Sequence, residues 1–447
     1  MNMTLIISIS GVRGIVPDSL TPEVCLDLAK AFGTYLNGGK VVVGTDPRQS
    51  SEFIKGIVFS GLLSTGCRVV DLGIAPTPTV GIMTRELEAA GGIVVTASHN
   101  PLPWNGLKFM RGDGIFLNES EAGEFLKLYH AKEWRCAPPR GVSVNRTGLD
   151  VHIRKVLKAI SGAAVKGAKL KVAFDGCNGA GSVAMVRFLE KLGCQVFAIN
   201  CNTRLPFPHN PEPVAANLGE LCELVKSRGA DIGFAVDSDA DRLAIVSNEG
   251  RASGEELTLA LAAKFVLGHK AVMSAKKPIV VVNLSTSRVI DDICKEQDAV
   301  LIRTKVGEVN VTEELKGLNG LIGGEGNGGV IFPAVGFNRD SLSGAGLVLS
   351  LLAASKKKVS ELVAQLPHYE MIKTKVECAS RDEANDFMEQ TKTAFKGYDL
   401  ILTEGLKIVL PDSWIHIRPS NTEPIVRIIA EARSREQAEE LIKKVTA

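Results

Sequence analysis

Three aspartates alternate with small residues in the segment DSDAD, which follows the apolar run IGFAV: Asp237, Asp239 and Asp241. Carboxylates this close together repel one another, a bound divalent cation relieves that repulsion, and an all-oxygen ligand set favours Mg²⁺. An EF-hand is excluded because its sixth and twelfth positions would be Arg242 and Asn248, where glycine and glutamate are needed. The pattern predicts one Mg²⁺ ion per chain. Two alternatives stay open at this point: an exposed acidic turn, and a phosphatase with Asp237 as its nucleophile.

The segment TASHNP places Ser98 beside His99, directly after the apolar run IVV. Neighbouring residues in an extended segment point in opposite directions, so we expect His99 not to act as the base for Ser98. The G-x-S-x-G elbow of serine hydrolases is also missing from the sequence. A serine that faces a carboxylate-bound metal and a phosphate pocket is better explained as a phosphoryl carrier. A simple turn built by Asn100 and Pro101 is the alternative.

Several further segments carry groups that suit a phosphorylated sugar. Guanidinium forks, hydroxyls and turn amides bind phosphate dianions, and the segment RPSNTEPIVR supplies them at Arg418, Ser420, Asn421, Thr422 and Arg427. The glycine-rich loop GGEGNGG offers Glu325 and Asn327, which could accept from and donate to sugar hydroxyls. Arg13 and Lys108 are cations that could flank a reacting phosphate. Taken one at a time, each of these could instead be a solvated turn or a surface ion pair.

The elements that position these loops repeat one pattern three times along the chain. Each copy has three apolar runs of four or five residues separated by helix-length stretches, which is typical of parallel strands covered on both faces. The third run of each copy ends in a polar or glycine-rich loop, and these loops are TASHNP, DSDADR and GEGNGG. Ligands bind at the carboxyl ends of the strands in open α/β sheets. We therefore expect the three loops to form one site.

The expected fold class is α/β, with three similar mixed-sheet α/β domains in tandem and a smaller α+β C-terminal domain around a central cleft. The expected domains are residues 1–145 (phosphoserine), 146–252 (metal-binding), 253–366 (sugar-binding) and 367–447 (phosphate-binding). The tail pattern indicates two or three strands and a final helix capped by Ser434. Residues 131–148 and 366–375 are predicted to be linkers.

The bulk composition excludes several classes of protein. The 52 basic and 50 acidic residues nearly cancel, and aromatic residues make up only 5% of the chain, so a nucleic-acid partner is not expected. The nine cysteines include no C-x-x-C pair and indicate reduced core residues. No run reaches the ~18 apolar residues that a membrane span requires. We expect a cytoplasmic protein without a membrane partner.

Five motifs, TASHNP, NGLK, DSDADR, GEGNG and RPSNTEPIVR, occur in an order that resembles the α-D-phosphohexomutase family over nearly the whole chain. The resemblance implies an isomerase that interconverts hexose 6-phosphates and 1-phosphates. Its phosphoserine passes a phosphoryl group to the sugar, and a sugar 1,6-bisphosphate is the intermediate and activator. A phosphorylated hexose is the implied partner, and the chain is expected to be a monomer or a homodimer. A non-catalytic sugar-phosphate-binding protein is the alternative on the same scaffold.

The resemblance also implies a role for each matching residue. Ser98 would be the phosphoserine and, through its phosphate, a metal ligand together with Asp237, Asp239 and Asp241. The candidates for the catalytic acid and base are Arg13, Lys108 and His99. The implied substrate-binding residues are Arg242, Lys305, Glu325, Asn327, Arg418, Ser420, Asn421, Thr422 and Arg427.

The chain departs from the family pattern at positions that bear on the choice of sugar. The metal loop reads DSDAD where many members have DGDGD, which changes the spacers and keeps the ligands. Gly329 stands where many hexose-type members carry a histidine, and Glu308 stands where relatives have histidine or aspartate. These departures are closer to phosphoglucosamine mutases than to phosphomannomutases. Glucosamine phosphate is therefore the expected substrate, with phosphomannomutase/phosphoglucomutase activity as the alternative.

Overall fold

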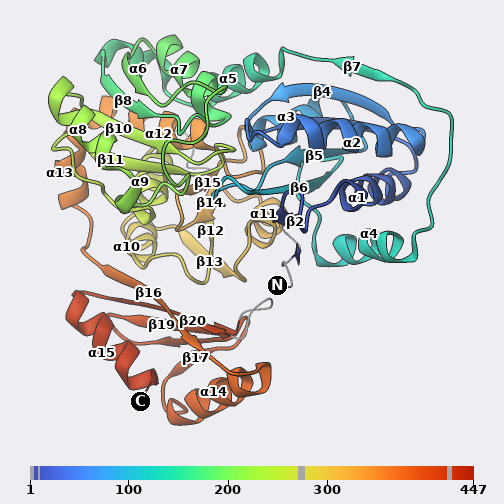
Figure 1. The fold of residues 1–447 in the computed structure, drawn as a ribbon. Helices are drawn as coiled ribbons and strands as arrows, with labels where there is room; N and C mark the ends of the chain where they lie inside the picture. Colours follow the sequence, from blue (N-terminus) through green and yellow to red (C-terminus); the bar gives the residue numbers. More distant parts are fainter. Residues whose placement is uncertain (1–4, 9–10, 270–276, 420–424, 447) are drawn as a thin grey trace.

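The structure, a computed structural model, describes residues 5–8, 11–269, 277–419 and 425–446. The chain forms four sheets in succession, and the last sheet with its helices stands apart from the other three, orange to red in Figure 1. We call these parts the first to fourth units. The predicted fold class, three mixed-sheet α/β units followed by an α+β unit, is confirmed. None of the helices among the described residues has both the length and the apolar character of a membrane span.

The first three units share one four-stranded core. In each, the first strand lies between the second and the third, these three are parallel, and a fourth strand returns antiparallel beside the third. The strands are β3 (Lys40–Thr45), β4 (Arg68–Ile74), β5 (Gly91–Val95) and β6 (Trp104–Arg111) in the first unit, β8 (Lys171–Asp175), β9 (Gln195–Ile199), β10 (Ile232–Val236) and β11 (Leu243–Ser247) in the second, and β12 (Ile279–Asn283), β13 (Val300–Thr304), β14 (Ile322–Glu325) and β15 (Gly329–Ile331) in the third. The sequence pattern identifies the three parallel strands of each copy but not the returning strand.

The first unit extends this core at both edges. Two short strands, β1 (Ile6–Ser8) and β2 (Gly11–Ile15), continue the sheet beyond β6, and β7 (Val142–Val144) pairs with β4. The prediction of a linker over residues 131–148 is therefore wrong at β7. All three residues of β7 are exposed, so this edge strand has no buried apolar alternation that a sequence pattern could reveal.

Helices cover the sheets of the three units, and the central strands β5 and β10 are buried along their whole length. Their bounds are α1 (Pro22–Tyr35), α2 (Ser51–Ser64), α3 (Thr77–Glu86) and α4 (Glu119–Ala131) in the first unit; α5 (Gly148–Ala159), α6 (Gly162–Ala168), α7 (Gly181–Lys191), the 3₁₀ turn η1 (Ala215–Asn217) and α8 (Gly219–Arg228) in the second; and α9 (Glu256–Gly268), α10 (Val289–Glu296), α11 (Glu308–Gly317), α12 (Ser341–Ser355) and α13 (Val359–Ala364) in the third. One apolar core runs through the second and third units, with α12 packed on α6 and α9. The fourth unit has a core of its own.

The fourth unit is a five-stranded antiparallel sheet with two helices. Its strands are β16 (Glu370–Glu377), β17 (Asp399–Ile401), β18 (Leu406–Val409), β19 (Trp414–Pro419) and β20 (Ile425–Ala432), and its helices are α14 (Arg381–Ala394) and α15 (Arg435–Thr446). Residues 405–432, where two or three strands were expected, hold three of these strands, and the other two precede that segment. The predicted linker over residues 366–375 is wrong as well, because β16 pairs with β20 over eight residues. The sequence of β16 is partly exposed and contains lysines, so its pattern does not indicate a strand. The strand is stabilised by β20, which lies about 50 residues further along the chain.

Buried polar contacts join the fourth unit to the third. Lys407 is only 3% exposed, its Nζ donates to the carbonyl of Leu284 at 2.6 Å, and it lies 4.0 Å from the centre of the Trp414 ring. Arg288 donates to the carbonyls of Leu410 and Pro411. These bonds fix one orientation of the fourth unit against the third.

Lys407 should make this arrangement dependent on pH. Burial, followed by the charge of Arg303, lowers its pKa to about 6. Since an unfolded lysine titrates near ~10.4, the folded protein binds fewer protons than the unfolded chain between these two values. Stability therefore rises with pH across that window. We expect Lys407→Met to raise the melting temperature relative to wild type most at pH 6, and this advantage to shrink toward pH 9. A difference in melting temperature that is the same at every pH would contradict the lowered pKa of Lys407.

Candidate active site

Ser98 lies in the loop after β5, at the edge of the sheet where the prediction placed it. The residue is 1% exposed, and its Oγ donates to Asp237 Oδ2 at 2.8 Å across the boundary between the first and second units. Its φ is +50°, a left-handed conformation, so the expectation of an extended segment is wrong. The conclusion drawn from that expectation nevertheless agrees with the structure, because the Ser98 hydroxyl is bonded to a carboxylate of another unit and not to His99.

A buried arginine that the sequence reasoning missed holds the Ser98 loop in this conformation. The guanidinium of Arg48 donates to the carbonyls of Ser98 (2.5 Å) and Asn100 (2.7 Å), and also to two carbonyls further along the loop. Its Nε donates to Asp46 at 3.0 Å. Asp46 and Arg48 directly follow β3, whose carboxyl end lies at the same edge of the sheet as that of β5. Two charged residues at that point were the available signal.

Arg48 should therefore position the side chain of Ser98. A lysine keeps the charge but cannot reach four carbonyls with one planar fork. We expect Arg48→Lys to lower kcat by ~100-fold, the order associated with a misplacement of about 1 Å, while Mg²⁺ binding stays within about threefold of wild type. Steady-state kinetics with calorimetric Mg²⁺ titration checks both values. Unchanged kcat in a folded variant would show that the loop keeps its geometry without this arginine.

The aspartates of the second unit form a compact acidic site after β10. All three are fully buried, and one ligand oxygen from each lies within 4.8 Å of the others. Asp239 Oδ1 and Asp241 Oδ1 are buried without a hydrogen-bond partner among the described residues. Buried carboxylate oxygens without a hydrogen-bond partner, in a cluster of this size, suit a divalent cation. The residues present therefore fit Mg²⁺.

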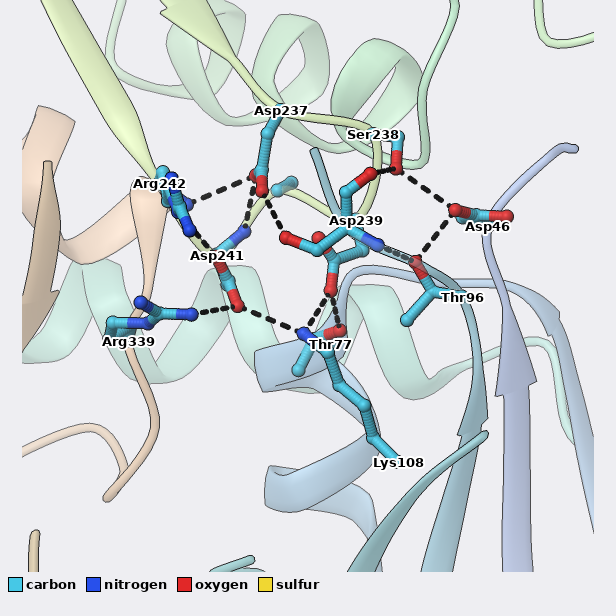
Figure 2. A network of polar contacts seen from close by, with 12 residues as sticks. Asp46, Thr77, Thr96, Lys108, Asp237, Ser238, Asp239, Asp241, Arg242 and Arg339 are labelled. Atoms are coloured by element: carbon cyan, nitrogen blue, oxygen red, sulfur yellow. Dashed lines mark hydrogen bonds and ion pairs between the residues drawn. The ribbon is translucent and has the colours of Figure 1, made fainter. Parts of the chain in front are cut away.

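Residues of the first unit hold this acidic loop through hydrogen bonds and ion pairs, as Figure 2 shows. Thr77, at the start of α3, donates its hydroxyl to Asp239 Oδ2 at 2.5 Å and its N–H to the Asp239 carbonyl. Ser238 donates to Asp46 at 2.9 Å. Lys108 Nζ lies 2.7 Å from Asp239 Oδ2 and 3.1 Å from Asp241 Oδ2. The metal loop and the serine loop are thus held in one fixed relation.

Burial and the close spacing of these carboxylates shift the pKa values of the groups in this cluster. Burial raises the pKa of Asp237 well above its ordinary value, and the carboxylates of Asp241 and Asp239 raise it further. Burial alone would lower the pKa of Lys108, but Asp239 and Asp241 outweigh it and the net shift is upward. Lys108 is therefore a permanent cation here, which suits charge stabilisation better than proton transfer.

The other predicted groups near the serine lie around the same cluster. Arg13 donates to Asn100 Oδ1 at 3.0 Å, and burial lowers its pKa. Burial, followed by the charges of Arg242 and Arg13, lowers the pKa of His99 to about 2, which makes His99 a neutral imidazole and a weak base. Arg242 donates its N–H to Asp237 Oδ1 at 3.2 Å. The structure thus brings Ser98, Arg13, His99, Lys108 and Arg242 to one place.

The glycine-rich loop of the third unit reaches this cluster through one side chain that the sequence did not single out. Glu325, at the end of β14, accepts from Asn283 at 2.9 Å and from Arg339 at 2.7 Å. The other end of the Arg339 guanidinium donates to Asp241 Oδ2 at 2.7 Å. Asn327 is partly exposed beside Glu325, with its Nδ2 3.4 Å from a Glu325 oxygen.

The predicted phosphate-binding residues of the fourth unit lie on neighbouring strands. Arg418 on β19 and Arg427 on β20 are directly opposite each other, a placement of like charges that an anion would stabilise. Arg418 donates to Glu404 at 2.7 Å, and Arg427 is exposed. Lys305 is exposed just before Val306, whose N–H also donates to Glu404. In the part of the chain that the structure describes, the partner of Arg418 is Glu404 and not an aspartate of the acidic loop, and Ser420, Asn421 and Thr422 lie outside the described residues.

Comparison with known proteins gives matches over the whole chain. Four family models match in order: phosphoglucomutase/phosphomannomutase alpha/beta/alpha domains I (residues 5–135), II (150–250) and III (254–369), and the C-terminal domain (371–447). The phosphoglucomutase/phosphomannomutase of Thermococcus kodakarensis is 39% identical, covering 97% of this chain and 95% of that protein. A protein of Methanopyrus kandleri named "Probable phosphoglucosamine mutase" is 37% identical with the same coverage. The structure of a Burkholderia thailandensis protein of this family shares the fold, with a TM-score of 0.84 at 24% identity over 98% of this chain and 96% of that one.

Proposed function

The chain belongs to the phosphoglucomutase/phosphomannomutase family of phosphohexomutases, and from that premise we propose that it converts glucosamine 6-phosphate to glucosamine 1-phosphate through a phosphorylated Ser98. The observation that carries the mechanism is the 2.8 Å hydrogen bond from Ser98 Oγ to Asp237, inside a buried group of three carboxylates. This bond supports a role for Ser98 as a nucleophile that acts beside a metal ion held by the acidic loop.

The proposed cycle has two transfers. A sugar hydroxyl attacks the phosphoserine phosphorus, the P–Oγ bond breaks, and the hydroxyl proton leaves to a base while Oγ regains a proton. The resulting 1,6-bisphosphate turns round and returns its other phosphoryl group to Ser98. Mg²⁺ bound by Asp237, Asp239 and Asp241 would neutralise charge on the transferring group. Lys108, which pairs with Asp239, and Arg13, which donates to Asn100, would stabilise that same charge from the side of the first unit.

The remaining candidates divide between the two ends of the substrate. Glu325, Asn327 and Arg242 would contact the sugar, and the fourth unit would hold the non-transferred phosphate through Arg418 and Arg427. The opposed pair of arginines supports that assignment, because a phosphate dianion accepts from two guanidinium forks at once. Lys305, Ser420, Asn421 and Thr422 complete the proposed set of substrate-binding residues.

The preference for glucosamine rests on Glu308 and Gly329. Glu308 puts a buried carboxylate near the glycine-rich loop, where its Oε2 lies 3.0 Å from Arg339 Nε. Gly329 leaves that loop without a side chain at its end. A carboxylate that contacts the sugar would favour the ammonium group of glucosamine over the neutral hydroxyl of glucose or mannose.

Turnover measured side by side on glucosamine, glucose and mannose 6-phosphates tests this choice. We expect kcat/KM for glucosamine 6-phosphate to be at least ~10-fold higher than for the other two, the order of discrimination from one charged contact. A higher value for mannose or glucose 6-phosphate would replace the proposed sugar and leave the phosphohexomutase reaction in place.

A further inference from the structure

Arg339 makes ion pairs to two different units from one guanidinium. NH2 donates to Asp241 Oδ2 of the second unit at 2.7 Å, and NH1 donates to Glu325 Oε2 of the third unit at 2.7 Å. Nε lies 3.0 Å from Glu308 Oε2, and the backbone N–H donates to Glu308 Oε1 at 2.9 Å. The residue is 8% exposed. Among the described residues, it is the one whose side chain pairs with both the metal loop and the glycine-rich loop.

The glycine-rich loop leaves space for the Arg339 side chain at Gly329. A Cβ placed on Gly329 would lie 2.2 Å from Arg339 Cδ and 2.9 Å from its Cγ, so the arginine stem occupies the space that a side chain at 329 would need. Ile331 and Arg339 also form an antiparallel bridge that fixes the backbone of both segments. The missing side chain at 329 and the arginine at 339 are therefore complementary features of one packing arrangement.

We propose that Arg339 is a positioning residue that fixes the orientation of Glu325 from the metal loop and, as a cation beside Asp241, restrains the affinity of that loop for Mg²⁺. The proposal rests on the proposed function, in which the acidic loop binds Mg²⁺ and the glycine-rich loop binds the sugar. The two effects have opposite signs. The fork orients Glu325 for the sugar, which favours substrate binding, whereas its charge repels a divalent cation that shares Asp241.

The opposite effects on substrate binding and on Mg²⁺ binding distinguish a positioning role from a merely structural one, which would weaken both. Arg339→Gln keeps a planar hydrogen-bonding group of similar shape but removes the charge. We expect the KM for the preferred sugar phosphate to rise at least tenfold, while the Kd for Mg²⁺ falls by up to tenfold. Arg339→Lys keeps the charge but cannot span Asp241 and Glu325, so its Mg²⁺ affinity should equal that of wild type and its KM should rise by about threefold or more.

A variant at a second position tests the same contact without touching the arginine. Gly329→Ala puts a methyl group against the Arg339 stem and should raise KM in the same direction. Gly123→Ala is the matched control, because nothing lies within 4 Å of a Cβ at that helical position, and it should behave as wild type.

The experiment is Mg²⁺ titration by calorimetry on the full chain, together with steady-state KM and kcat and a melting curve for each variant. A raised KM together with tighter Mg²⁺ binding in Arg339→Gln supports the proposal. A raised KM together with weaker Mg²⁺ binding, or an unchanged value of either quantity, overturns it. If Arg339→Gln does not fold, Arg339→Lys and Gly329→Ala decide by the same two readouts. Absence of turnover in wild type would instead contradict the proposed function, and the Mg²⁺ titration would still report on Arg339.

Discussion

Ser98→Ala should abolish mutase activity, with a loss of at least ~10⁴-fold in kcat, because the covalent carrier of the phosphoryl group is removed. The alanine keeps the loop, since the carbonyl of Ser98 and not its hydroxyl accepts from Arg48. The metal triad also keeps its own backbone bonds to Asp237. Binding of Mg²⁺ should therefore survive while turnover is lost.

Two readouts make this result specific. Intact-protein mass spectrometry after incubation with a sugar 1,6-bisphosphate should show one added phosphoryl group on wild type and none on Ser98→Ala. Ser60→Ala, a serine exposed on α2 that bonds only within its helix, is the matched control and should retain full activity. Undiminished activity of Ser98→Ala would mean that another residue is the nucleophile, with Asp237 as the first candidate.

Asp239→Asn should lower Mg²⁺ affinity by ~100-fold and kcat/KM by ~10³-fold, a loss of about 4 kcal/mol of transition-state stabilisation. The substitution preserves shape but removes one of three anionic ligands, and it also takes a carboxylate from Lys108. Calorimetric titration with Mg²⁺ and kinetics at saturating Mg²⁺ measure the two losses. Removal of the metal from wild type with a chelator should mimic the kinetic loss and be reversed by added Mg²⁺.

The control for this variant is Asp386→Asn, an exposed aspartate on α14 far along the chain from the acidic loop. It should leave both quantities unchanged. Equal Mg²⁺ affinity in Asp239→Asn and wild type would mean that the acidic loop is not the metal site.

The part of the site that could be predicted from sequence is the part in which each residue follows a buried strand. Asp237 directly follows such a strand, Glu325 ends one, and Ser98 is the third residue after one, and the apolar runs before them are strong signals. The same rule that collects the carboxyl ends of parallel strands at one edge predicted that these loops meet. The structure agrees, through the Ser98–Asp237 bond and the Arg339 pairs to Asp241 and Glu325.

What the sequence did not reveal depends on long-range packing. Arg48 and Thr77 act on loops about 50 and 160 residues away. The charged pair after β3 marks Arg48 as a candidate but does not show which loop it holds, and no local pattern distinguishes Thr77 from other residues at the start of a helix. Arg339 sits in an irregular loop, where spacing carries no information about the three carboxylates it meets. The left-handed backbone of Ser98 and the strand β16 were missed for the same reason, since each is imposed by distant partners.

The central claim is that one phosphoryl group moves between enzyme and sugar without being lost to water. Phosphorus NMR of a hexose 6-phosphate, incubated with the protein, Mg²⁺ and a trace of sugar 1,6-bisphosphate, tests it most directly. The account predicts that the 1-phosphate signal grows as the 6-phosphate signal falls, with inorganic phosphate staying at the level of a sample without enzyme. Stoichiometric release of inorganic phosphate, or no 1-phosphate from any of the three sugars, would contradict it.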